Sequence, residues 1–204
     1  MKAIYLMFIS MLIAVNALGQ DLEFGKITIN PYIPAESGVE GTAAKLLEIK
    51  LKRIVTTSDA TGGFDRRFVI VPELNILSEN TTASIPQKTS LKASITFFIG
   101  DGVSGSLFGS IDMEVTGIGD NHESALYSAI RKIPANNKEL QGLIVECKQR
   151  IVKYYNNAAP ALIKEAEKCM AGMDYETALS KLAVISALCK DYDKAQKLII
   201  QCGK

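Results

Sequence analysis

Residues 106–133 read SLFGSIDMEVTGIGDNHESALYSAIRKI, and within this stretch the period of a strand gives way to the period of a helix. Apolar and polar residues alternate over Ser106–Thr116, which is typical of a strand with one face in water. One face carries Leu107, Gly109, Ile111, Met113 and Val115, and the other carries Phe108, Ser110, Asp112 and Glu114. After Gly117-Ile118-Gly119 we expect a helix with Asp120 or Asn121 as N-cap. Its apolar stripe is Ala125, Leu126, Ala129, Ile130 and Ile133, and Pro134 ends it.

Two further strands are expected upstream, and both are rich in β-branched and apolar residues. They cover Arg67–Leu77 and Leu91–Ile99. Pro72 has no N–H to donate to a sheet, which places the first of these strands at an edge or at a bulge. The segment Ser78–Thr89 between them is polar and contains Pro86, so we expect a loop there.

One more strand and two helices flank this group. Apolar residues between Leu22 and Ile33 suit a first strand. Residues 40–57 and 137–155 place their apolar side chains at helical spacing. This order indicates an α+β fold, in which a small, mostly antiparallel sheet has helices on one face.

The end of the chain predicts an appended helical module. Asn156-Asn157-Ala158-Ala159-Pro160 interrupts the long helix and supplies a proline near a new N-terminus. Residues 158–187 then predict a helical hairpin, and Asp191–Gln201 predicts a third helix. We therefore expect an α+β domain over residues 20–156 and a helical module over residues 157–204.

The beginning of the chain has the pattern of a secretory signal. Lys2 precedes the apolar stretch Ala3–Val15, which is shorter than the roughly 18–20 apolar residues that a membrane helix needs. Ala17-Leu18-Gly19 places small residues where a signal peptidase cuts. We expect residues 1–19 to be removed, no transmembrane anchor to remain, and the mature protein to be periplasmic or secreted.

The overall composition is that of a globular protein. Of the 204 residues, 48% are hydrophobic and 22% are charged, and the formal net charge is +1. This balance gives no electrostatic reason to expect nucleic acid or an anionic membrane as partner. Residues 136–204 have a weak basic excess, with 11 basic and 8 acidic side chains. A partner of the helical module would therefore present an acidic surface.

A family resemblance lies within residues 67–133. The segments FVIVPELNIL, SITFFIGDG and VTGIGDNHESALYSAIRKI are similar in layout to envelope proteins of the CsgG, LPP20 and FlgT type. In those proteins a sheet strand leads through a short glycine-containing turn into an alanine-rich helix. Gly117, Gly119, Ala125 and Ala129 carry the resemblance. It implies an accessory protein of a Gram-negative cell envelope, without catalysis.

A second resemblance lies in residues 158–187, which are similar to one tetratricopeptide helix pair. The matching positions are Ala166, Tyr175, Ala178 and Leu182, with Gly172 near the turn between the helices. The resemblance implies a tetratricopeptide-like module. Two interpretations stay open, a peptide-binding groove and a hairpin packed on its own domain.

Gly100, Gly102 and Gly105 spell the dinucleotide-binding pattern G-x-G-x-x-G, and Asp120 stands where an acid on the ribose is expected. That fingerprint needs a helix that begins inside the glycines, so that its amides face the pyrophosphate. Here a strand pattern follows the glycines. We therefore interpret Gly100–Gly105 as a hairpin connection with its turn at Asp101-Gly102.

The remaining chemical groups give no strong site. His122 is the single histidine, and a helix start explains it together with Asp120 and Ser124. One histidine and four scattered cysteines do not form a zinc pattern, so no metal and no cofactor are expected.

The cysteines of an exported protein can form disulfides. If residues 191–201 are helical, Cys189 and Cys202 lie roughly 20 Å apart, too far to be bridged. An up-down-up arrangement favours Cys169 with Cys202. Free buried thiols are the alternative.

Together these patterns predict an exported, non-enzymatic protein-interaction module that binds a protein partner in the cell envelope. The helical module or the sheet edge would make the contact, and Tyr175 and Tyr192 are the candidate partner-binding residues. The alternative is a hydrolase or a small-ligand-binding protein. Its site would be assembled from residues without a linear motif, such as Asp101, Asp112 and His122.

Overall fold

The computed structural model describes residues 27–58, 67–83, 85–187 and 189–203. The expected signal peptide and the start of the expected first strand lie outside these ranges. The described residues form two compact units, 27–147 and 148–203.

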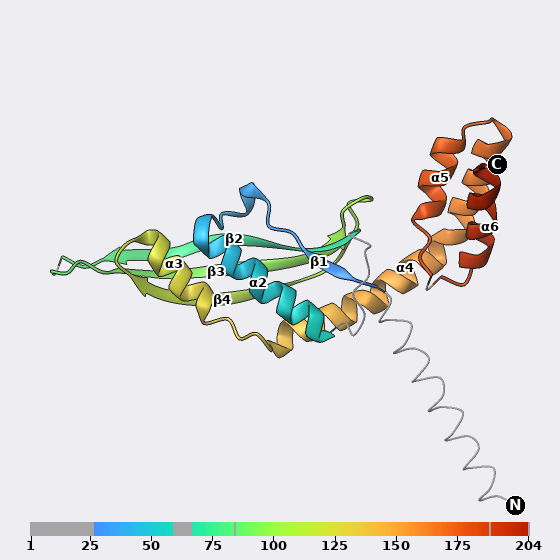
Figure 1. The fold of residues 1–204 in the computed structure, drawn as a ribbon. Helices are drawn as coiled ribbons and strands as arrows, with labels where there is room; N and C mark the ends of the chain where they lie inside the picture. The colour runs from blue at the N-terminus through green and yellow to red at the C-terminus, as the bar shows by residue number, and fades with distance from the viewer. Residues whose placement is uncertain (1–26, 59–66, 84, 188, 204) are drawn as a thin grey trace, which may run out of the picture. The chain divides into compact units, whose positions relative to one another are not determined.

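The first unit is built on a four-stranded sheet, here called the sheet unit (Figure 1). Its strands, in spatial order, are β1 (Ile29–Pro31), β2 (Phe68–Thr81), β3 (Thr89–Asp101) and β4 (Leu107–Gly119). β1 is parallel to β2, whereas β2, β3 and β4 are antiparallel neighbours. The expected α+β class with a mostly antiparallel sheet is confirmed.

Helices cover one face of this sheet. Figure 1 shows α2 (Gly41–Ser58) and α3 (His122–Arg131) side by side over the strands, and the 3-10 turn Ala35–Ser37 precedes α2. Alternate residues of β3 point into this layer and are fully buried, namely Leu91, Ala93, Ile95, Phe97 and Ile99. Leu47, Leu51 and Ile54 of α2 and Ala129 and Ile130 of α3 are buried as well. The apolar faces that the sequence predicts for these helices and strands therefore pack together in one core.

Pro72 explains where the short strand β1 leaves the sheet. β1 pairs only with Phe68–Ile70, and the Tyr32 amide then donates to the Ile70 carbonyl over 3.0 Å. The next bond of a parallel ladder would come from the N–H of residue 72, which proline lacks. From Pro72 onward, β2 has a strand neighbour only on its β3 side. The expectation of an edge at this proline is thus correct for that part of the strand.

The expected loop Ser78–Thr89 is wrong at both ends. β2 continues to Thr81 and β3 begins at Thr89, so the connection covers only residues 82–88. The added residues are polar and mostly exposed, yet their backbones pair in register from Ser78 opposite Lys92 to Thr81 opposite Thr89. The two strands therefore extend beyond the apolar residues from which the sequence pattern predicts them, because their backbones continue to pair.

A bulge changes the expected facing of β4. The register shifts between Gly109, which is opposite Ile99, and Leu107, which is opposite Gly100, so Phe108 is the extra residue. As a result Phe108 is buried and stacks edge-on against Phe68, with ring centroids 6.1 Å apart, whereas Leu107 is exposed. The assignment of Leu107 to the buried face and of Phe108 to the water face was therefore wrong.

The second unit, here called the helical unit, contains the later part of α4 (Lys138–Ala171), α5 (Tyr175–Ala183) and α6 (Tyr192–Cys202). The expected hairpin and third helix are present. The expected break at residues 156–160 is wrong, because α4 runs without interruption through Pro160. A proline removes one backbone hydrogen bond of a helix. The helical residues on both sides of Pro160 continue the helix despite this missing bond. The two units divide at Cys147/Lys148, within α4.

Lys148 is a buried cation in the helical unit. Its residue is 2% exposed, and burial lowers the pKa of its ammonium to about 8 because the charged form is disfavoured away from water. The pKa in the folded protein lies below the ordinary lysine value of 10.5, so between pH 8 and pH 10.5 the unfolded chain binds more protons than the folded one. The contribution of Lys148 to the free energy of unfolding therefore rises with pH through this window.

We expect Lys148→Met to be more stable than the wild type at pH 7, where the wild type carries the buried charge. This advantage should shrink by about 3 kcal/mol as the pH rises from 8 to 10.5, because the wild-type lysine becomes neutral. Urea unfolding of both proteins at pH 7 and at pH 10, followed by circular dichroism, measures the difference. A stability difference that is the same at both pH values would contradict this interpretation.

Candidate functional site

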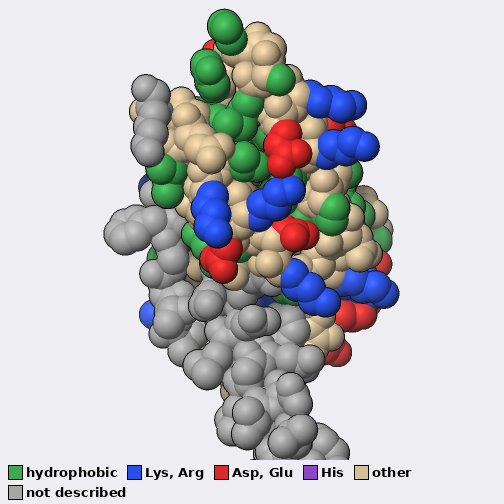
Figure 2. Space-filling view, turned by 90° about the vertical axis from the view of Figure 1, so that its right-hand side faces the viewer, with side chains coloured by type: hydrophobic (Ala, Val, Ile, Leu, Met, Phe, Trp, Pro, Cys, Tyr) green, Lys and Arg blue, Asp and Glu red, His purple; other side chains and the backbone are tan. Residues whose placement is uncertain are grey.

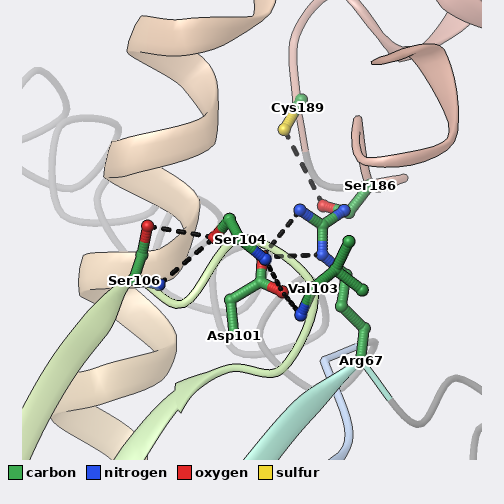
Figure 3. A network of polar contacts seen from close by, with 7 residues as sticks. All are labelled: Arg67, Asp101, Val103, Ser104, Ser106, Ser186 and Cys189. Atoms are coloured by element: carbon green, nitrogen blue, oxygen red, sulfur yellow. Dashed lines mark hydrogen bonds and ion pairs between the residues drawn. The ribbon is translucent and has the colours of Figure 1, made fainter. Parts of the chain in front are cut away.

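The Asp101 carboxylate is held at one end of the sheet, at the turn from β3 to β4 (Figure 3). One oxygen, Oδ2, accepts hydrogen bonds from the Arg67 guanidinium, 2.8 Å from Nε and 2.7 Å from a terminal nitrogen. The other oxygen, Oδ1, accepts from the backbone amides of Val103 at 2.8 Å and Ser104 at 3.2 Å. The side chain of Asp101 is fully buried and that of Arg67 is 9% exposed. This ion pair ties the start of β2 to the turn.

The glycine pattern at this turn belongs to a hairpin. The Asp101 amide donates to the Ser106 carbonyl, and the Gly105 amide donates to the Asp101 carbonyl, each over 2.9 Å. Gly105 has a φ of 71°, a backbone conformation that glycine adopts without strain. The expected hairpin connection between the two strands is confirmed.

His122 lies at the opposite end of the sheet, at the start of α3. Its Nδ1 is 2.8 Å from a carboxylate oxygen of Glu79 on β2. Asn121, one of the two expected N-caps, caps the helix: its side chain accepts from the Ser124 amide, and the Ser124 hydroxyl accepts from the Asn121 amide. Asp120 instead pairs with Lys88. His122 and Asp120 thus bind the start of α3 to the β2–β3 hairpin, whereas Ser124 is occupied in the cap of the helix.

The residues of the alternative hydrolase or ligand site do not converge. Asp101 and His122 lie at opposite ends of a sheet whose strand β3, at about 3.3 Å per residue, is roughly 40 Å long. Asp112 lies between them on the open face, where it accepts a hydrogen bond from Thr96 over 2.5 Å. The same separation divides Asp120 from the glycine turn. This arrangement cannot assemble one site from these side chains.

A shallow hollow of about 430 Å³ lies beside His122. Gly38, Glu40, Gly41, Glu123 and Leu126 line it together with the histidine. The Glu123 carboxylate accepts a hydrogen bond from Thr42 over 3.2 Å. Within the described ranges, no three histidine, cysteine or acidic side chains are placed to hold a metal ion.

The two candidate partner-binding tyrosines are separated. Tyr175 begins α5 and is 45% exposed, whereas Tyr192 begins α6 and is half-buried. The chain reverses at each connection, so the end of α4, the start of α5 and the end of α6 lie together (Figure 1). Tyr192 lies at the other end of the helices. Ion pairs hold this order, from Lys181 to Glu165 at 2.6 Å and from Lys194 to Glu167 at 3.1 Å.

Apolar side chains gather at the end that contains Tyr175. Met173 is 79% exposed and Ile200 is 60% exposed, and we call Met173, Tyr175 and Ile200 the helical tip. Figure 2 draws one face of the molecule, with apolar side chains toward its upper end and a band of mixed basic and acidic side chains below them. Sequence reasoning named Tyr175 but missed the other two. Ile200 could have been found, because it lies off the inward stripe of its own helix.

The four cysteines are free in the structure. Cys147 and Cys189 are buried, and the Cys189 sulfur lies 3.7 Å from the Ser186 hydroxyl (Figure 3). Cys169 and Cys202 are half-buried. The Cys169–Cys202 pairing therefore stays a prediction.

No family model matches this chain, and no curated protein matches it. A solved structure of a Caulobacter crescentus CB15 protein described as a lipoprotein is 15% identical, covers 65% of this chain and 89% of that chain, and has a TM-score of 0.33. A minor lipoprotein from Acinetobacter baumannii is 16% identical, covers 57% of this chain and 91% of that chain, and has a TM-score of 0.36. Scores this low describe a partial similarity and assign no function to this chain. Among the described helices, none has the length and apolar content to cross a membrane.

Proposed function

We propose that this chain is an exported protein of the cell envelope that acts by binding another protein and does not catalyse a reaction. The exposed helical tip is the observation that carries the binding role. Three large apolar side chains from three different segments remain in water at one end of the helical unit. The signal pattern at the beginning of the sequence supports export.

The helical tip has features of a binding surface. Exposed aromatic and methionine side chains are over-represented where proteins bind one another, because they give large contact area. The helical unit also has a positive net charge, with 9 basic and 6 acidic residues over 148–203. An acidic partner surface would complement it.

We expect a photoreactive phenylalanine analogue at position 175 to cross-link one discrete partner protein in intact cells. The same analogue at Tyr127 of α3 is the matched control, because Tyr127 is also a tyrosine and is 38% exposed, but it belongs to the sheet unit. Gel shifts and mass spectrometry identify the products. Met173→Asn should weaken the cross-link at position 175 by about tenfold, because it removes apolar contact area.

Met173→Asn is suited to this test because residue 173 has a φ of 62°, which asparagine tolerates better than methionine does. The variant should therefore stay folded by circular dichroism. Equal cross-linking from positions 127 and 175, or a partner captured only from position 127, would move the binding surface to the sheet unit. Cross-linking from position 175 that Met173→Asn leaves unchanged would exclude Met173 as part of the contact.

A further inference from the structure

Three separate segments of the sheet unit that meet near Ile133 carry basic residues. Lys50, Lys52 and Arg53 come from the second half of α2, Arg131 and Lys132 from the end of α3, and Lys138 from the start of α4. The Lys50 ammonium donates to the Ile133 carbonyl over 2.6 Å, which fixes α2 against the α3–α4 connection. We call these six residues the cationic corner.

A hollow of about 510 Å³ opens within the cationic corner. It is lined by Lys52, Arg53, Thr56, Thr57, Ala135 and Asn136. The lining is thus built from two cations, two hydroxyls and one amide, and it contains no carboxylate. The Thr56 and Thr57 hydroxyls donate to the Lys52 and Arg53 carbonyls over 2.6 and 2.8 Å, so the donors available to an anion are the two cations and the Asn136 amide.

The positive charge here is poorly compensated. Lys52 pairs with Glu48 on its own helix at 2.5 Å, but within the described ranges no ion pair involves Arg53, Arg131, Lys132 or Lys138. The pKa of Lys50 is lowered first by burial and then by the neighbouring charge of Arg53. A second cation close enough to oppose protonation indicates a locally positive potential.

Helix stability does not account for this concentration. Cations stabilise a helix at its last turn and destabilise it at its first turn. Arg131 fits that rule, but the last turn of α2 has no basic residue, and Lys138 occupies the first position of α4. The basic residues of α2 and Lys138 are therefore not placed to stabilise the ends of their own helices.

We propose that the cationic corner binds a phosphate group, with Arg53 and Lys132 as principal contacts and the hollow beside Thr56 and Asn136 as its seat. A phosphate offers oxygens in the geometry that guanidinium and ammonium donors match. Two sources carry this chemistry, the headgroup of an anionic lipid and a soluble phosphorylated molecule. The corner belongs to the sheet unit, so this site is independent of the helical tip.

The test compares the purified full chain with Arg53→Gln/Lys132→Gln. The matched control is Lys153→Gln/Lys164→Gln, which changes the net charge equally at two exposed lysines of the helical unit. Sedimentation with phosphatidylglycerol vesicles and with phosphatidylcholine vesicles measures the lipid arm. Calorimetric titration with pyrophosphate measures the soluble arm.

If the ligand is a lipid headgroup, we expect the wild type and the control to bind phosphatidylglycerol vesicles in preference to phosphatidylcholine vesicles. If the ligand is a soluble phosphorylated molecule, we expect both proteins to bind pyrophosphate. Arg53→Gln/Lys132→Gln should bind about thirtyfold more weakly, at roughly fivefold per cation removed near an anionic surface. All four substituted side chains are exposed, so both variants should keep the circular dichroism spectrum of the wild type. Binding of neither probe, or an equal loss in the control, would overturn the proposal.

Discussion

Gly117→Ala is expected to destabilise the protein by about 4 kcal/mol, because the added methyl group has no space. A Cβ on Gly117 would lie 1.9 Å from the Ala125 carbonyl oxygen and 2.5 Å from the Ala129 amide nitrogen. Both atoms belong to the backbone of α3, so neither can turn away as a side chain would. The helix would have to separate from β4. Urea unfolding followed by circular dichroism measures the loss.

Gly142→Ala is the matched control for this prediction. Gly142 lies in α4, it is exposed, and a Cβ there would meet nothing within 4 Å. Alanine should therefore stabilise the helix by about 1 kcal/mol through its better helix propensity. Equal stabilities of Gly117→Ala and wild type would show that α3 does not pack directly on this glycine.

Asp101→Ala is expected to destabilise the sheet unit by about 4 kcal/mol, because it removes the buried carboxylate that pairs with the nearly buried Arg67. It also removes the acceptor of the Val103 and Ser104 amides. Denaturant unfolding of the variant against wild type measures this loss.

Asp101→Asn separates the two contributions, since its amide oxygen can still accept from the turn while its charge is gone. Its loss should be smaller than that of Asp101→Ala but still above about 2 kcal/mol. Glu114→Gln breaks the exposed ion pair with Lys92 on the open face of the sheet and should change stability by less than about 1 kcal/mol. If Asp101→Asn unfolds like wild type, the ion pair does not hold the turn.

Local patterns predicted much of this fold. Alternation located β3 and most of β4, and the stripe of Ala125, Leu126, Ala129 and Ile130 located α3, because burial repeats with the geometry of each element. The glycines of the β3–β4 turn were also interpretable, since the residues after them continue as a strand. Gly117 and Gly119 have a physical role in this fold, because α3 lies so close to both that a Cβ would have no space.

Features that depend on distant residues could not be predicted in this way. Arg67 and Asp101 are far apart in the sequence, and only the pairing of β2 with β3 brings them together. The cationic corner is assembled from three segments, so a nearly neutral net charge conceals it. The continuity of α4 through Pro160 was missed because a proline is read locally as a helix boundary, whereas the helix on both sides is long.

The sheet has one bulge in β2 and one in β4, and they differ in whether the extra residue can be deleted. In β2 the register passes from Ile76 directly to Ser78, so Leu77 is the extra residue, and it is 45% exposed. Loss of the Leu77 codon would leave every other residue of the strand on its present face and would turn the bulge into regular pairing. The same loss at Phe108 would remove a buried aromatic ring from the core. The β2 bulge therefore marks a position at which the chain can shorten, and the β4 bulge marks a position at which the extra residue belongs to the core.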